Sequence, residues 1–194
     1  MSPRAGLDTR TLVLAAAELA DEQGIAEVTL AGLAAKLGVR SPSLYNHVNG
    51  LKELRTLLAV HGLEQLQTAM ETSLEGIRGD TAVHAMSKAY VEFARQHPGL
   101  YETTLRAPEE GNTALAEASE QILSLIINVL EDYDLGEEGG LHAVRGLRSI
   151  LHGFASLKNQ GGFGMPLDLE DSLTRLINTY IAGIRCMKSG EEHG

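Results

Sequence analysis

A cluster of hydrogen-bonding side chains stands out between residues 40 and 47. Six residues of this stretch carry a donor, an acceptor or both: Arg40, Ser41, Ser43, Tyr45, Asn46 and His47. Guanidinium, amide and hydroxyl groups are the side-chain groups that hydrogen-bond to base edges and to phosphate oxygens. The stretch is therefore a candidate surface for contact with nucleic acid.

Three short helices are expected to position this cluster. The first runs from Asp8 or Thr9 to Gly24, the second is capped by Thr29 and ends at Gly38, and the third opens with Ser41 as N-cap and Pro42 and is broken at Asn49-Gly50. A small core would be closed by Leu33, Leu37, Val39, Leu44 and Val48. The glycine-containing turn between the second and third helices is typical of a helix-turn-helix. An ordinary three-helix cap with a polar surface is the alternative interpretation.

The sequence offers little for catalysis or metal binding. Its seven histidines lack the i, i+4 pairing of helical metal sites, and His142 and His152 are ten residues apart. Acidic pairs such as Glu109-Glu110 fall at expected loops, where solvation accounts for them. We therefore expect no enzyme, metal or cofactor. A helical enzyme without DNA binding and a helical adaptor that binds only proteins are the competing classes, and the adaptor leaves the cluster at residues 40–47 without a role.

Charge is distributed unevenly along the chain. The 194 residues carry a net charge of -10, but residues 1–55 hold six basic and six acidic side chains, so the acidic excess lies beyond residue 55. A neutral N-terminal part is compatible with DNA binding that relies on specifically positioned contacts rather than on non-specific attraction to phosphates. Apolar runs such as Leu12 to Ala17 are too short to span a membrane, and the single Cys186 cannot form an internal disulfide. These features predict a soluble cytoplasmic protein.

Helical spacing of apolar residues continues along the rest of the chain, and the period-2 pattern of strands is absent. Further helices are expected over about residues 51–74, 80–97, 113–133, 141–159 and 168–187, with a Gly-rich turn at 136–140. The wide apolar stripe of the helix at 113–133 predicts that this helix is substantially buried. The predicted fold class is all-α with about nine helices. A helix-turn-helix domain covers 1–50, a second helical domain covers 51–188, and a frayed tail follows at 189–194.

The N-terminal part resembles the DNA-binding domain of the TetR family of transcriptional regulators. The matching residues are Gly24-Ile25, Val28-Thr29-Leu30, Leu33-Ala34, Leu37-Gly38-Val39, Ser41, Leu44-Tyr45, His47-Val48 and Lys52-Glu53-Leu54. The resemblance implies that Thr29 and Tyr45 contact phosphates. It also implies that sequence is read by Arg40, Ser43, Asn46 and His47.

One position departs from the family pattern. The family usually has Lys at the position of Leu51, whereas this chain has Lys52 one residue later. Binding to DNA would then depend more on Thr29, Arg40, Tyr45 and Lys52.

The C-terminal part is similar to the TetR-family regulatory domain named for a Trp-His-Gly motif, with Leu151 in place of the Trp before His152-Gly153. Such domains dimerise through their last two long helices, which implies a homodimer that reads a palindromic site. The expected interface is Leu147, Ile150, Leu151, Phe154, Leu173, Ile177, Tyr180 and Ile184. A monomer in which these residues pack internally is the alternative.

The resemblance also predicts a small-molecule cavity between the DNA-binding and dimer helices, and its occupancy would change DNA binding. The candidate lining residues are Met86, Tyr90, Phe93, Tyr101, Leu105, Leu123, Ile127 and His152, each of which could instead be plain core. The sequence thus predicts a ligand-responsive regulator, a repressor that binds a palindromic operator as a homodimer and is released by a small-molecule effector.

Overall fold

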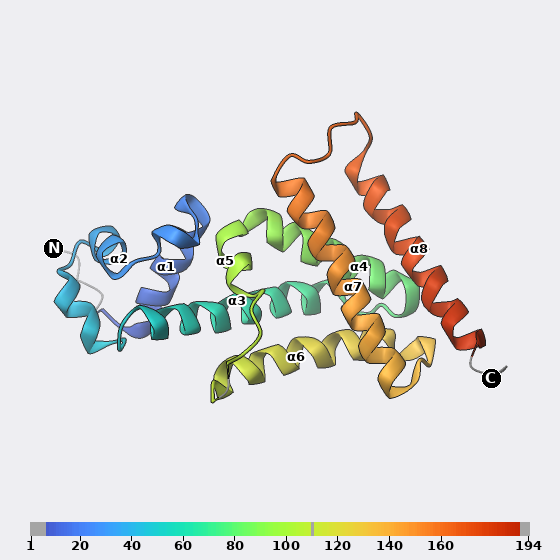
Figure 1. Cartoon of the computed structure of the whole chain (residues 1–194), viewed down its shortest axis with the longest axis horizontal. Coiled ribbons are helices and arrows are strands. Elements are labelled where there is room, and N and C mark those ends of the chain that lie inside the picture. Colours follow the sequence, from blue (N-terminus) through green and yellow to red (C-terminus); the bar gives the residue numbers. More distant parts are fainter. Residues whose placement is uncertain (1–6, 110, 191–194) are drawn as a thin grey trace. The chain divides into compact units, whose positions relative to one another are not determined.

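The computed structural model describes residues 7–109 and 111–190, and over that part of the chain it contains helices and loops but no strands. The elements, in order, are α1 (Thr9–Gln23), η1 (Ile25–Glu27), α2 (Leu30–Leu37), η2 (Ser41–Asn46), α3 (Leu51–Ser73), α4 (Gly79–Gln96), α5 (Pro98–Thr103), α6 (Thr113–Leu130), η3 (Glu131–Tyr133), α7 (Gly136–Asn159) and α8 (Leu169–Gly190) (Figure 1). The η elements are short 3-10 helices. The predicted all-α class is confirmed, and the eight described α-helices together with η2 make up the nine that were expected.

The chain forms two compact units. Unit 1 comprises residues 1–65 and 97–118, and unit 2 comprises residues 66–96 and 119–194. The first unit thus includes the beginning of α3, all of α5 and the beginning of α6, in addition to the helix-turn-helix segment. Of the predicted tail, residues 189 and 190 belong to α8, and residues 191–194 lie outside the described part.

The ends of the first two helices follow from their capping residues. The Asp8 carboxylate accepts a hydrogen bond from the backbone N–H of Thr11 at 2.7 Å, and the Thr29 hydroxyl accepts one from the N–H of Gly32 at 3.0 Å. At the other end of α2, Gly38 adopts the left-handed conformation with φ +66°. These caps confirm the predicted limits of α1 and α2.

Two expected helix starts are wrong. The third helix of the helix-turn-helix is the 3-10 helix η2, and its N-cap is Arg40 rather than Ser41, which is already the first helical residue. The Gly-rich segment 136–140 is not a turn but the first turns of α7. Glycine weakens a helix without forbidding it, and the packing of the following Ala143 and Val144, both buried, outweighs that cost.

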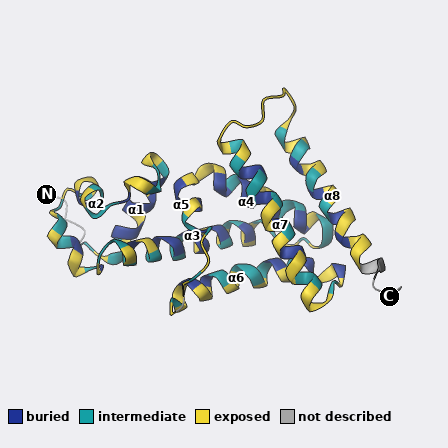
Figure 2. Cartoon of the chain, viewed as in Figure 1, coloured by how far each residue is buried: buried dark blue, intermediate teal, exposed yellow. Residues whose placement is uncertain are grey.

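Unit 1 is built around apolar side chains of α1, α2, η2 and α3. Leu12, Leu33, Leu44, Leu54 and Leu58 are each 0% exposed, and the dark segments of Figure 2 mark this core. Of the small core expected for the helix-turn-helix, Leu33, Leu44 and Val48 are buried, whereas Leu37 and Val39 remain half-exposed. Because Leu44 of η2 is buried in this core, the orientation of η2 is fixed, and its other sides face solvent.

Unit 2 is built around α4, which packs against α7 and α8. Val83 and Met86 of α4, Leu147 of α7 and Ile177 of α8 are almost completely buried. A polar group ties the start of α4 to its neighbours, because the hydroxyl of Tyr133 donates to the Asp80 carboxylate at 2.7 Å. Polar and apolar contacts thus hold α4 together with α7, α8 and the segment around Tyr133.

Helix α6 is less buried than its apolar stripe predicted. Ile126 and Leu130 are buried, but Ile127 is 38% exposed, and only 22% of the most apolar window of this helix is buried. The expectation was wrong because a broad stripe needs neighbours on two sides to cover it. Among the described residues, the segment Thr113–Tyr133 is long and apolar enough to meet a length-and-composition test for a membrane span, a test that core helices also pass.

Candidate nucleic-acid interface

The 3-10 geometry of η2 sorts the polar cluster into three rows. Residues three apart lie above one another in such a helix, because each turn contains three residues. The row of Leu44 faces the core, and the side chains above and below it, Ser41 and His47, are half-buried. Tyr45 and Asn46, which belong to the other two rows, are exposed, and Tyr45 is 59% exposed. Leu44 therefore anchors the element while its neighbours are presented outward.

The entry to η2 adds the remaining members of the cluster. Arg40 is exposed and precedes the helix in an extended conformation. Ser43 is half-buried, and its backbone N–H donates to the carbonyl of Arg40 at 2.9 Å. At the far end, the Thr9 hydroxyl donates to the carbonyl of His47 at 3.3 Å, which joins η2 to the start of α1. Hydrogen bonds therefore hold both ends of the segment 40–47.

Thr29 lies at the N-terminus of α2 and is half-buried. Its hydroxyl oxygen already accepts the capping hydrogen bond from Gly32. A hydroxyl has one proton to donate in addition to its acceptor sites, so the cap leaves a donor for an anionic oxygen. The helix N-terminus also favours negative charge. The chemistry at Thr29 therefore suits a phosphate.

Lys52, the other predicted phosphate contact, is engaged elsewhere in unit 1. Its ammonium group is 2.8 Å from a carboxylate oxygen of Glu109, and this hydrogen bond raises the pKa of Lys52. Both side chains are exposed, so the pair is readily exchanged for another partner. The other lysine of this region, Lys36, pairs with Glu22 at 3.0 Å and with Glu18 at 3.3 Å, and so holds α2 against α1.

The residues predicted to line an effector cavity are divided between the two units. Tyr101 and Leu105 belong to unit 1, and the other six belong to unit 2. Met86, Tyr90, Phe93 and Tyr101 are buried, Leu105, Leu123 and His152 are half-exposed, and Ile127 is exposed. None of the six in unit 2 lines the cavity described next, so their role in ligand binding stays a prediction.

Unit 2 contains a cavity of about 860 Å³ between α4, α7 and α8. Its apolar side includes Val91, Phe154, Leu173 and Ile177. Its polar side includes Thr81, His84, Lys88, Glu92, Lys158 and Glu170, and the Lys88 ammonium pairs with Glu170 at 2.9 Å. The His84 ring nitrogen Nε2 is 2.8 Å from the side-chain oxygen of Asn178. This combination of an apolar wall and a few polar groups is typical of small-molecule sites.

The residues predicted for the dimer interface are largely part of the unit's own core. Leu147, Leu151, Phe154, Leu173, Ile177 and Ile184 are buried within a single chain, which leaves Ile150 and Tyr180 half-exposed. The Tyr180 hydroxyl donates to the carbonyl of Ala143 at 2.8 Å, so this side chain also joins α8 to α7. An interface on these helices would therefore use side chains other than the six that are buried.

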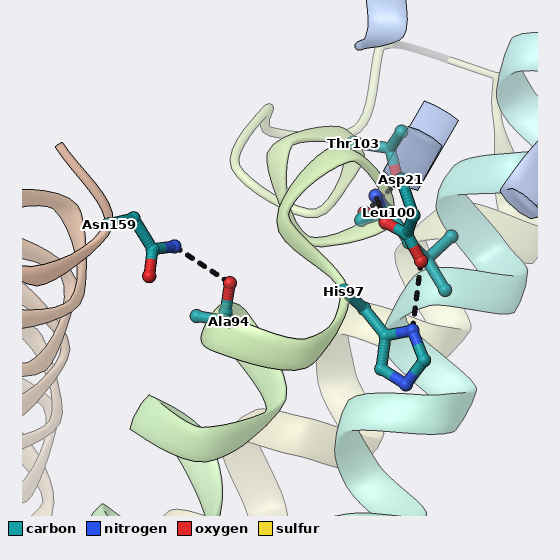
Figure 3. A network of polar contacts seen from close by, with 6 residues as sticks. All are labelled: Asp21, Ala94, His97, Leu100, Thr103 and Asn159. Carbon is teal, nitrogen blue, oxygen red and sulfur yellow. Dashed lines mark hydrogen bonds and ion pairs between the residues drawn. The ribbon is translucent and has the colours of Figure 1, made fainter. Parts of the chain in front are cut away.

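A polar junction that the sequence did not reveal joins α1 to α5 within unit 1 (Figure 3). The Asp21 carboxylate lies 2.8 Å from Nδ1 of His97 and accepts a hydrogen bond from the backbone N–H of Leu100 at 2.8 Å. The His-Pro-Gly sequence at 97–99 indicates a helix boundary, but its partner lies 76 residues away in the chain. No local signal could therefore have identified the pair.

Two family profiles match this chain. One, described as bacterial regulatory proteins of the tetR family, matches residues 12–47. The other, described as the tetracyclin repressor-like C-terminal domain, matches residues 83–180. A Bacillus subtilis (strain 168) protein named as the uncharacterized HTH-type transcriptional regulator YobS is 43% identical over 185 residues, which span 95% of this chain and 96% of that protein.

Solved structures share the fold. A protein of unknown function from Rhodococcus sp. RHA1 superposes with a TM-score of 0.80 and 22% identity, over 94% of this chain and 98% of that one. The Streptomyces coelicolor TetR family protein ActR, in complex with (S)-DNPA, superposes with a TM-score of 0.67 and 18% identity, over 96% of this chain and 99% of that one. At these identities the likeness concerns the fold.

Proposed function

Because this chain belongs to the TetR family of bacterial transcriptional regulators, we propose that it represses transcription by binding a palindromic DNA operator as a homodimer. The proposal includes release from the operator by a small-molecule effector. The family membership makes the chain a helix-turn-helix regulator rather than an enzyme. Such a protein would act in the cytoplasm, where bacterial DNA is found.

The observation that carries the DNA-binding proposal is the presentation of η2. Leu44 is completely buried, whereas Arg40, Tyr45 and Asn46 are exposed on the same short element. An anchored helix with exposed hydrogen-bonding side chains has little conformational entropy to lose on binding. Arg40 and Asn46 are suited to base edges, and Tyr45, Thr29 and Lys52 to phosphates. Ser41, Ser43 and His47 complete the proposed contact surface.

The homodimer is supported by the exposed apolar side chains of unit 2. Among the described residues, Leu157 on α7, Met187 on α8, and Phe163, Met165 and Leu167 in the loop between them are exposed to solvent. A second copy placed against α7 and α8 would remove such apolar area from water. Two copies related by a two-fold axis also place two recognition segments on a palindrome.

The effector is proposed to bind the 860 Å³ cavity of unit 2. The volume lies within the range of roughly 300–1,000 Å³ that small-molecule sites occupy. The related protein ActR has been solved with (S)-DNPA bound. Ligand binding at this position would change DNA affinity if the ligand prefers one of two conformations of the protein.

Selection of binding sites from random DNA duplexes with the full-length protein tests the DNA-binding proposal. We expect an enriched symmetric motif whose affinity falls steeply with salt concentration. Arg40→Ala should weaken binding to that motif about tenfold or more and relax specificity at one base pair of each half-site. Lys52→Ala should instead weaken binding to all sequences and reduce the slope of log affinity against log salt by about 1.

A matched control is Arg78→Ala, which removes an exposed arginine of unit 2 that is far along the chain from η2. Its affinity for the selected motif should equal that of the unmodified protein. Circular dichroism should show the same helix content for all three variants. The absence of any symmetric motif from a folded sample at low salt would overturn the proposal.

A further inference from the structure

A second cavity lies entirely within unit 1. It has a volume of about 760 Å³ and is lined by residues of η1, of the first turns of α3, of α5 and of the segments 105–109 and 112–115. None of the residues of η2 lines it, but Lys52 does. The cavity is therefore next to the helix that directly follows the recognition segment, and it is separate from the cavity of unit 2.

The polar side of this cavity is rich in cationic groups. Lys52, Arg55 and Arg106 line it together with Glu102 and Glu109. The Glu109 carboxylate is bound by Lys52 at 2.8 Å. Neither Arg55 nor Arg106 lies within ion-pair distance of a carboxylate in the described part of the chain, and the charge of Arg106 helps to lower the pKa of Glu109. Two exposed arginines that are not held in an ion pair within the described part of the chain therefore line one cavity.

Much of the remaining lining is apolar, although Thr56, Thr103 and Asn112 also belong to it. Aliphatic surface is supplied by Ile25 of η1, Leu51 and Ala59 of α3, Leu115 of α6, and Leu105 of the loop after α5. Ala59 and Leu115 are themselves buried, which makes this wall part of the core of unit 1. A lining that combines aliphatic side chains with cationic groups matches a molecule that has an anionic head and an apolar body.

We propose that this cavity is a binding site for an amphipathic carboxylate, such as a medium-chain fatty acid or an aromatic acid. A carboxylate has the planar geometry that guanidinium groups bind through two parallel hydrogen bonds. The apolar wall removes the body of the ligand from water. A neutral molecule of the same shape would lack the charge-assisted hydrogen bonds to these exposed arginines. The binding does not depend on the operator proposed above.

Tryptophan fluorescence provides a direct test, because the chain contains no tryptophan. Ala107 lines the cavity and is exposed, so Ala107→Trp places a single reporter there with little strain. Decanoate should change its emission in a saturable way. Decanol, the neutral molecule of equal chain length, should bind at least about tenfold more weakly than decanoate. Thr56→Trp, also on the lining, is a second reporter should the first variant fail to fold.

One test variant, Arg106→Gln, and two controls, Arg78→Gln and Ala89→Trp, locate the site. Arg106→Gln in the reporter background should weaken decanoate binding about tenfold, since it removes charge-assisted hydrogen bonds, whereas Arg78→Gln should leave it unchanged. Ala89→Trp places the reporter on the cavity of unit 2 and should not respond over the same concentrations. Equal binding of decanoate and decanol, no effect of Arg106→Gln, or a response only from Ala89→Trp would each overturn the proposal. Failure to find an operator would not affect this result.

Discussion

Single residues in this protein carry both structural and functional tasks. The Thr29 hydroxyl closes the N-terminus of α2 by accepting a hydrogen bond from Gly32, and its proton remains available to a phosphate. A substitution to Ala would therefore remove about 1 kcal/mol of helix capping together with any DNA contact. Thr29→Ser, which keeps the hydroxyl, is the variant that separates loss of the side-chain methyl group from loss of the cap.

Asp80 is the residue for which the structure makes a pH-dependent prediction. The hydrogen bond from Tyr133 and the nearby Arg185, whose guanidinium lies 2.6 Å from the carboxylate, lower the pKa of Asp80 below its ordinary value of 3.8. The ionised form is thus favoured in the folded state. Its stabilising contribution is complete above about pH 4 and is lost as the pH falls through the lowered pKa.

We therefore expect Asp80→Asn to reduce the free energy of unfolding at pH 7, and this reduction to shrink steadily below pH 4. The side chain is 44% exposed, so solvent screening keeps the effect modest. Urea titrations of both proteins at several pH values measure it. Asp132→Asn, which changes a nearby exposed carboxylate, should show no comparable trend. A difference between Asp80→Asn and the unmodified protein that grows on acidification would contradict the assignment.

At the scale of elements, α5 is held between α1 and α3 by close backbone contacts. A Cβ atom at Gly99 would overlap the carbonyl group of Ala20 in α1. A Cβ atom at Gly62 of α3 would lie 2.9 Å from Cγ2 of Thr104 and 3.1 Å from the carbonyl oxygen of Leu100. The Asp21 carboxylate then binds the start of α5. The position of α5 is therefore closely coupled to that of α1.

Gly99→Ala should be strongly destabilising, because the added methyl group can be accommodated only if α5 moves away from α1. We expect a loss of about 1–3 kcal/mol or more in the free energy of unfolding. Gly140→Ala is the matched control. It lies within α7, has nothing within 4 Å of the added Cβ, and should gain up to about 1 kcal/mol from helix propensity. Chemical denaturation measures both, and similar stabilities for the two variants would rule out the proposed close packing.

At the scale of the whole molecule, the exposed apolar residues bear on assembly. The core residues of α7 and α8 are buried within one chain. Leu157 nevertheless remains 49% exposed and Met187 52% exposed. These side chains, and not the buried ones expected from the sequence, are the candidates for contact with a second copy.

We expect Leu157→Glu to shift the protein from dimer to monomer, since a carboxylate buried in an apolar interface loses its hydration. Leu14→Glu is the control, because Leu14 on α1 is similarly exposed at 43% and lies in unit 1. Sedimentation velocity should show twice the mass of one chain for the unmodified protein and for Leu14→Glu. A monomeric unmodified protein, or identical behaviour of the two variants, would refute the proposed interface.

The sequence by itself determined the features that depend on neighbours within a few residues. The caps at Asp8 and Thr29, the left-handed Gly38 and the polar exterior of the segment 40–47 were all predictable, because capping and helical spacing are local interactions. The family pattern followed from the same stretch. The 3-10 geometry of η2 and the helical conformation of residues 136–140 were not predictable, since tertiary packing overrides weak local preferences.

Only the tertiary structure decided which distant residues meet. Asp21 and His97, and Lys52 and Glu109, are separated by more than 50 residues in the chain, and no local pattern relates them. Helical periodicity identified the apolar residues of α7 and α8, but it could not distinguish the side that packs within one chain from the side left exposed. The cavity beside Lys52 likewise exists only because four separate elements converge there. Local interactions therefore specified the helices, and long-range packing specified the sites.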